Sequence, residues 1–145
     1  TNFNKSMNKS DYYTQKLNLL PHPEGGYYRE TYRSATRCEF KGFDGERSLA
    51  TSIYFLLTAE RSSAMHRIKS DEIWYFHDGD ALDIMMIDIE GNHSTVRLGK
   101  NLDDNEVLQF VVPAGFWFGA KTTGDYSLVG CEVSPGFDFR DFELM

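Results

Sequence analysis

Two residues whose side chains could move protons, His66 and Glu72, lie six positions apart in the stretch from His66 to Gly79. A histidine and a glutamate that face one aromatic cavity form a plausible acid–base pair. Burial would raise the pKa of the glutamate and favour the neutral histidine, whereas pairing would favour the charged forms of both. The sequence therefore predicts the pair, and the sign of each pKa shift depends on the geometry.

The segment that carries Glu72 has the alternation of a β-strand, which places neighbouring side chains on opposite faces. One face carries Glu72, Trp74 and Phe76, and the other carries Ile73, Tyr75 and His77. Asp78-Gly79 is a strong hairpin signal, and residues 82–87 are the predicted return strand. We therefore expect His77 to face away from Glu72, and we expect His22 and His93 to be solvated in turns.

Elements at the two ends of the chain frame this segment. Residues 1–9 are polar and patternless, and we interpret them as a disordered tail, with one domain over residues 10–145. A short helix is predicted from Ser10 as its cap to Pro21, with Tyr13, Leu17 and Leu20 along one face. The phenylalanines of residues 137–142 predict a C-terminal segment that closes over the fold.

Two predicted strands lie between the helix and His66. In residues 27–34, alternation puts large polar-tipped side chains on both faces: Tyr27, Arg29, Thr31 and Arg33 on one, and Tyr28, Glu30, Tyr32 and Ser34 on the other. A strand with no apolar face is typical of a sheet edge, a subunit contact or a pocket rim. Residues 49–57 are almost continuously apolar, as in a strand covered on both sides. Many short strands with almost no helix indicate an all-β sandwich or barrel.

Composition excludes several classes of function. The 145 residues fit one domain, and a net charge of −7 without a Lys/Arg cluster argues against a nucleic-acid partner. No apolar run approaches the roughly 18–20 residues that span a bilayer, so we expect a soluble, cytoplasmic protein without a membrane partner. Cys38 and Cys131 belong to no C-x-x-C pair and are expected to be reduced thiols.

Several motifs resemble the cupin superfamily, in a largely uncharacterised, RmlC-like branch. The first cupin motif is similar to residues 66–79, and the second to residues 107–118 with their Pro113-Ala114-Gly115 turn. Residues 22–34, 70–74 and 135–139 extend the resemblance over nearly the whole chain from about residue 12. The resemblance implies a cupin jelly roll, a double-stranded β-helix barrel, which is commonly a homodimer and has a small-molecule pocket in each barrel.

The resemblance also identifies the positions where cupins hold a metal. Two of the four ligand positions are Ile68 and Phe118 in this sequence, which leaves His66 and Glu72. Borderline transition metals need more nitrogen and carboxylate ligands than these two. We therefore expect no metal cofactor, and at most a weak divalent metal at His66 and Glu72.

Two functions follow for such a pocket. The first is a metal-independent isomerase or epimerase that acts on a sugar or nucleotide-type ligand, because the metal-free sugar epimerases that share the cupin fold use a barrel histidine and a tyrosine. The second is a non-enzymatic binding protein in which His66 and Glu72 are structural remnants of a lost metal site. In both, the pocket residues predicted to contact the ligand are Arg29, Trp74, Phe76, Trp117 and Phe118. We expect His66 and Glu72 to be joined directly or through one water, and the homodimer to use residues 27–34 or 49–57.

Overall fold

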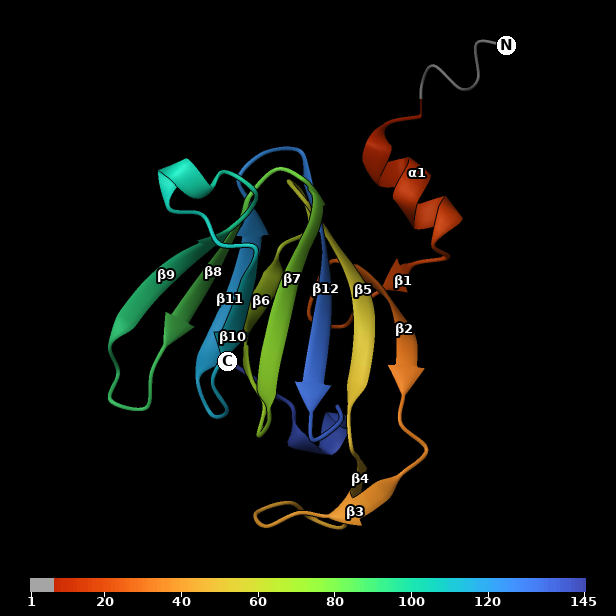
Figure 1. The fold of residues 1–145 in the computed structure, drawn as a ribbon, viewed down its shortest axis with the longest axis vertical. Coiled ribbons are helices and arrows are strands. Elements are labelled where there is room, and N and C mark those ends of the chain that lie inside the picture. The colour runs from red at the N-terminus through yellow and green to blue at the C-terminus, as the bar shows by residue number, and fades with distance from the viewer. Residues whose placement is uncertain (1–6) are drawn as a thin grey trace.

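Two antiparallel sheets make up most of the computed structural model, which describes residues 7–145 (Figure 1). The larger sheet has the order β1 (Leu20–Pro21), β2 (Tyr27–Arg33), β5 (Thr51–Thr58), β12 (Tyr126–Ser134), β7 (Asp71–Gly79), β10 (Gln109–Val112). The smaller sheet has the order β13 (Glu143–Leu144), β6 (Ser63–Arg67), β11 (Trp117–Thr122), β8 (Leu82–Ile87), β9 (His93–Leu98). The remaining elements are α1 (Lys9–Lys16), the hairpin β3 (Arg37–Glu39) and β4 (Glu46–Ser48), and the 3-10 turns η2 (Leu102–Asp104) and η3 (Phe139–Asp141). The predicted all-β jelly roll with one short N-terminal helix is confirmed.

Helix α1 is shorter than the sequence predicts. Its N-cap is Asn8 rather than Ser10, and the Asn8 side chain accepts a backbone N–H of the first turn at 2.8 Å. The chain turns early because Asn18 adopts a left-handed conformation with φ of 55°. Leu20, expected on the apolar face of the helix, therefore lies in β1 and is 65% exposed. Of the predicted N-terminal tail, residues 1–6 lie outside the described residues.

The core fills the space between the two sheets. Trp74, Phe118 and Phe55 are almost fully buried there, together with Ile68. Burying an aliphatic or phenylalanine side chain contributes about 1.5–3 kcal/mol, so this cluster is a large share of the folding free energy. A second, smaller cluster of buried residues lies between α1 and the outer face of the larger sheet: Leu19, Leu56 and Leu128.

A bulge in β2 changes which of its side chains face the interior. The register between β2 and β5 shifts between Glu30 and Tyr32, so that Thr31 is an extra residue in the ladder. An extra residue moves every later side chain to the opposite face. Arg33 therefore joins Tyr28 and Glu30 on the interior side, whereas strict alternation had placed it on the opposite face.

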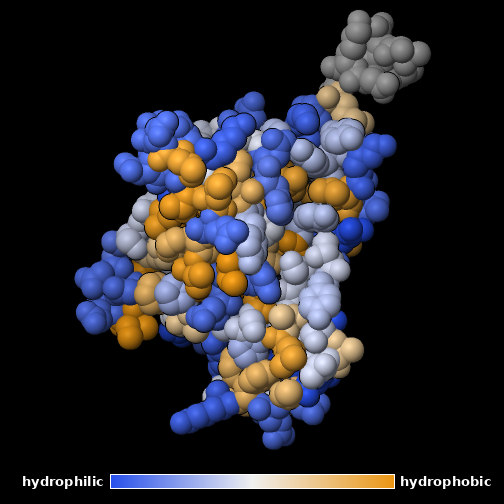
Figure 2. All heavy atoms as spheres, in the orientation of Figure 1, coloured by the Kyte–Doolittle hydropathy of each residue, from blue (hydrophilic) through white to orange (hydrophobic). Residues whose placement is uncertain are grey.

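The surface of the viewed face mixes polar and apolar side chains (Figure 2). Apolar side chains gather over the β10 side of the barrel and again near the end that carries β3 and β4. Single exposed apolar residues are normal on soluble domains, and Leu108 and Val111 are each nearly half exposed. Among residues 7–145, no helix has the length and apolar character needed to cross a membrane.

Candidate functional site

A cavity of about 430 Å³ opens at one end of the barrel. Its walls come from the inner face of the larger sheet, from β6 of the smaller sheet, from the turn between β1 and β2, and from the C-terminal segment. The lining residues include Tyr28, Glu30 and Arg33 of β2, Phe55 of β5, Glu72 of β7, Cys131 of β12, His66 of β6, His22 and Glu24 of the turn, and Phe137, Asp138 and Phe139. Aromatic walls with a few convergent polar groups are the usual form of a small-molecule site.

The turn at residues 22–26 brings Glu24 into this cavity. Gly25 and Gly26 both have positive φ, at 111° and 75°, which only glycine adopts without strain. A Cβ on Gly25 would overlap the backbone carbonyl oxygen of Ser62, so the turn lies directly against the chain that leads into β6. Two hydrogen bonds fix the glutamate there, from Ala64 N–H to its carbonyl oxygen at 2.8 Å and from the Ser63 hydroxyl to its Oε2 at 3.0 Å.

His66 has protein partners for both ring nitrogens. Nδ1 lies 2.7 Å from the carbonyl oxygen of Ala64, and because a carbonyl only accepts, Nδ1 carries a proton. Nε2 lies 2.8 Å from Oε2 of Glu24. Burial lowers the pKa of His66, but the hydrogen bond and charge of Glu24 outweigh it, and the net pKa is raised. Both ring nitrogens thus face oxygen atoms, an environment that favours the protonated imidazole. The rings of Phe118 and Phe142 lie against the imidazole.

The surroundings of Glu72 favour its protonated, uncharged form. Burial raises its pKa to about 8, and the charge of Glu24 adds to the shift, while His66 opposes it. The carboxyl is thus protonated at pH 7, next to the thiol of Cys131, whose own pKa burial also raises. The sequence predicted a direct or one-water link between His66 and Glu72, but the direct partner of His66 is Glu24.

His22 is buried, although the sequence predicted a solvated turn histidine. Its Nδ1 accepts the backbone N–H of Glu24 at 3.1 Å, and its ring lies edge-on to Tyr28 at 4.6 Å between centroids. Burial lowers the pKa of His22, so the ring is neutral. Because Nδ1 accepts this backbone N–H, it carries no proton that it could donate to Oε1 of Glu24, which lies 3.4 Å away. The other two histidines, His77 and His93, are exposed as predicted.

The predicted ligand-contact residues lie elsewhere in the fold. Trp74 and Phe118 are buried in the core, and Phe76 packs against it. Trp117 lies under the guanidinium of Arg67, and Arg29 lies on the exposed side over Tyr54. None of these five predicted contacts lines the cavity described above. Alternation correctly predicted that Glu72, Trp74 and Phe76 share the inward face of β7. Of these three side chains, only Glu72 lines the cavity.

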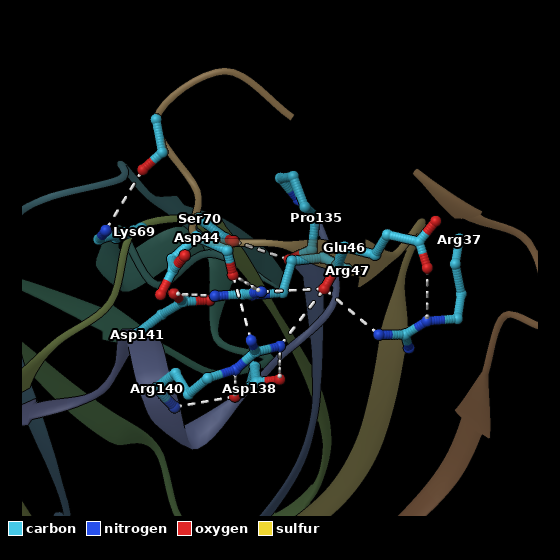
Figure 3. Close-up of polar contacts among 11 residues, drawn as sticks. Arg37, Asp44, Glu46, Arg47, Lys69, Ser70, Pro135, Asp138, Arg140 and Asp141 are labelled. Atoms are coloured by element: carbon cyan, nitrogen blue, oxygen red, sulfur yellow. Dashed lines mark hydrogen bonds and ion pairs between the residues drawn. The ribbon is translucent and has the colours of Figure 1, made fainter. Parts of the chain in front are cut away.

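The C-terminal wall of the cavity is held by a network of charged side chains (Figure 3). Arg47 donates two hydrogen bonds of 2.8 Å to Asp141, and both side chains are almost fully buried. Beside this pair, Arg140 contacts both carboxylate oxygens of Asp138, at 3.1 and 2.9 Å. The network joins η3 to the β3–β4 hairpin and so fixes Phe139 at the cavity.

The donor set does not fit the metal site that the sequence resemblance implies. Ile68 and Phe118, at two of the ligand positions, are buried apolar core residues. Within the described part of the chain, no three His, Cys, Asp or Glu side chains are grouped so that they could hold a metal ion.

Comparisons with known proteins agree on one family. A family model described as the cupin superfamily (DUF985) matches residues 11–145. The solved structure of protein SO0799 from Shewanella oneidensis is 48% identical, covers 96% of this chain and 85% of that one, and has a TM-score of 0.87. A hypothetical protein from Leishmania major is 39% identical over 95% of this chain and 88% of that one, with a TM-score of 0.89. Oxalate decarboxylase from Bacillus subtilis, 14% identical over 86% of this chain and 29% of that one with a TM-score of 0.62, shows the likeness of the fold alone.

Proposed function

The chain belongs to the cupin superfamily, in the DUF985 family, and on that premise we propose that it binds a small molecule and isomerises or epimerises it without a metal. The ligand would be a sugar or nucleotide-type molecule held in the cavity at the barrel end. One observation carries the proposal: Glu72, a carboxyl whose pKa burial raises to about 8, lines the same cavity as the hydrogen-bonded pair of Glu24 and His66. Titratable groups whose surroundings push them into opposite states are the usual basis for separate acid and base roles.

The roles of the groups follow from their hydrogen bonds. Oε1 of Glu24, the oxygen not bonded to His66, would accept a proton from a carbon beside a carbonyl group. The electrons of that C–H bond move to the carbonyl oxygen, and Glu72 donates its proton there. A solvent water on the opposite face then gives a proton to the carbon, which inverts it, while Glu72 takes back the proton of the enol oxygen and the carbonyl re-forms. Glu24 releases the abstracted proton to solvent, so both carboxyl groups return to their starting states. His66 holds the Glu24 carboxylate in place, with its own orientation set by Ala64.

A second candidate is a binding protein without catalytic activity. It is favoured by the fact that both ring nitrogens of His66 are already bonded to protein groups, Ala64 and Glu24. In that case Glu24 and His66 stabilise the cavity wall, and Glu72 only offers a hydrogen bond to the ligand.

Deuterium exchange separates the two candidates. The protein is incubated in D2O with a panel of reducing sugars and sugar nucleotides, and incorporation at carbon is followed by mass spectrometry. We expect incorporation that falls by at least about 100-fold in Glu72→Gln and in His66→Gln. His77→Gln, on the exposed face of β7, is the matched control and should keep the wild-type rate.

Two outcomes would contradict the proposal. Binding of a panel member without any incorporation would favour the binding protein. Incorporation that is unchanged in both cavity variants would show that the exchange occurs elsewhere and that His66 and Glu72 belong to the framework.

A further inference from the structure

We propose that the molecule this cavity accepts is uncharged, a hydroxyl-rich ring without a phosphate, carboxylate or ammonium group. This inference rests on the proposed function, because it narrows the ligand of the same site from a sugar or nucleotide-type molecule to a neutral sugar. It is carried by the way in which each charged side chain at the cavity is already matched by an opposite charge of the protein.

The first matched pair is at the mouth of the cavity. Arg33 donates two hydrogen bonds to the Glu30 carboxylate, at 3.1 and 2.7 Å. The same guanidinium donates to the carbonyl oxygen of Phe137 at 3.1 Å. Arg33 is the only lysine or arginine in the lining of the described cavity. Its guanidinium is hydrogen-bonded to Glu30 on one side and to Phe137 on the other.

The other charges are matched in the same way. The Asp138 carboxylate is held by Arg140 through both oxygens, and deeper in the cavity the Glu24 carboxylate is held by His66. The two remaining groups, Glu72 and His22, are buried, which disfavours their charged forms, and Nδ1 of His22 accepts a backbone N–H of the protein. A ligand therefore meets hydrogen-bonding groups and no net charge.

A charged ligand meets only partners that are already engaged in the lining of this cavity. A phosphate needs a cation that is free to bind it, and Arg33 is already hydrogen-bonded to Glu30 and to the carbonyl oxygen of Phe137. An ammonium group meets the reverse problem, because the carboxylates of Glu30 and Asp138 are already engaged. Arg29, the one cation among the ligand contacts expected from the sequence, lies outside the cavity lining.

The apolar part of the cavity suits the carbon-bound face of a ring. Four aromatic side chains line it: Tyr28, Phe55, Phe137 and Phe139. A pocket with apolar walls and few polar groups buries most of a small ligand and uses the polar groups to orient it. A reducing sugar in its ring form presents both surfaces, hydroxyl groups at its edge and C–H groups on its face, and its open form supplies the carbonyl group of the proposed step.

The test uses matched triplets of sugars that differ only in charge. Each triplet contains a hexose, its 6-phosphate and its 2-amino-2-deoxy analogue, in the gluco, galacto and manno configurations. Binding to the full chain at pH 7 is measured by saturation-transfer NMR and by titration. We expect the neutral member of at least one triplet to bind about tenfold or more tighter than both charged members.

Two variants of the mouth pair should switch this preference. Glu30→Gln leaves Arg33 without its carboxylate and should raise the affinity for the 6-phosphate by about tenfold. Arg33→Gln leaves Glu30 without its guanidinium and should raise the affinity for the amino sugar by a similar factor. Glu90→Gln, in an exposed turn, is the control that should change neither. Thermal melting establishes that each variant is folded.

The inference is overturned if the wild-type protein binds the phosphate or the amine as tightly as the neutral sugar. It is also overturned if no triplet binds to any form of the protein, or if the two mouth variants keep the wild-type order. The proposed function fails separately: neutral sugars that bind without deuterium exchange reject the chemistry, and exchange only on sugar phosphates rejects the substrate class.

Discussion

Replacing Glu72 by glutamine should stabilise the protein, and the gain should grow with pH. The pKa of Glu72 rises from the 4.5 of a solvated carboxyl to about 8 in the folded state. Between these values the unfolded chain has lost the proton while the native protein keeps it. The native state therefore binds more protons, and the free energy of unfolding falls as pH rises through this window.

The size of the effect follows from the shift. Each pKa unit corresponds to about 1.4 kcal/mol, so the loss between pH 5 and pH 7.5 is about 3 kcal/mol after partial ionisation at each end is included. Glutamine has no proton to lose and keeps similar shape and hydrogen-bonding capacity. The difference in unfolding free energy, Glu72→Gln minus wild type, should rise by this amount over that range.

Urea unfolding followed by tryptophan fluorescence at four pH values between 5 and 7.5 measures the difference. Subtraction removes the contribution of other titrating groups that the substitution leaves unchanged. Glu90→Gln, whose side chain is exposed, is the control and should give a difference that stays flat over this range. A flat difference for Glu72→Gln as well would show that Glu72 is ionised in the native protein, and the general-acid role would be refuted.

Four further predictions address other parts of the site. Asp141→Asn should lower the free energy of unfolding by roughly 3–5 kcal/mol in urea, since it leaves a buried guanidinium without its carboxylate. Gly25→Ala should be destabilised by roughly 2–4 kcal/mol, whereas Gly42→Ala, also at positive φ but with open space around it, should lose only about 1 kcal/mol. Glu24→Gln should lower the pKa of His66, measured by NMR titration of its ring protons, because the charge of Glu24 then no longer offsets the effect of burial. Elemental analysis should find far less than one transition metal per chain, and stoichiometric metal that is lost in a His66→Ala variant would contradict this.

The fold was predictable because its signals are local and repeated. Glycine and aspartate turns end the strands, and alternation in β7 places Glu72 and Trp74 inward and His77 outward, as the structure has them. Two motifs at fixed spacing then identified the barrel. None of these signals depends on contacts between distant parts of the chain.

The site was less predictable because it depends on such contacts. Glu24 lies in a turn, and its place beside His66 comes from hydrogen bonds to β6, some forty residues later in the chain. The bulge at Thr31 reverses the face of Arg33, and strict alternation gives no sign of it. The paired glycines after Glu24 were the one local signal, because they require a tight turn at that point.

The position of Glu24 on a turn, rather than on a barrel strand, separates the carboxylate of this site from the ladders of the two sheets. The ladder hydrogen bonds of the strands that hold His66 and Glu72 run to other strands, so a different side chain at position 24 leaves them in place. A shorter turn, or one without a carboxylate, would remove the charge that raises the pKa of His66 and leave its ring bonded through Nδ1 to Ala64 alone. Evolution could therefore move a barrel of this kind between proton transfer and simple binding by exchanging five residues outside the barrel.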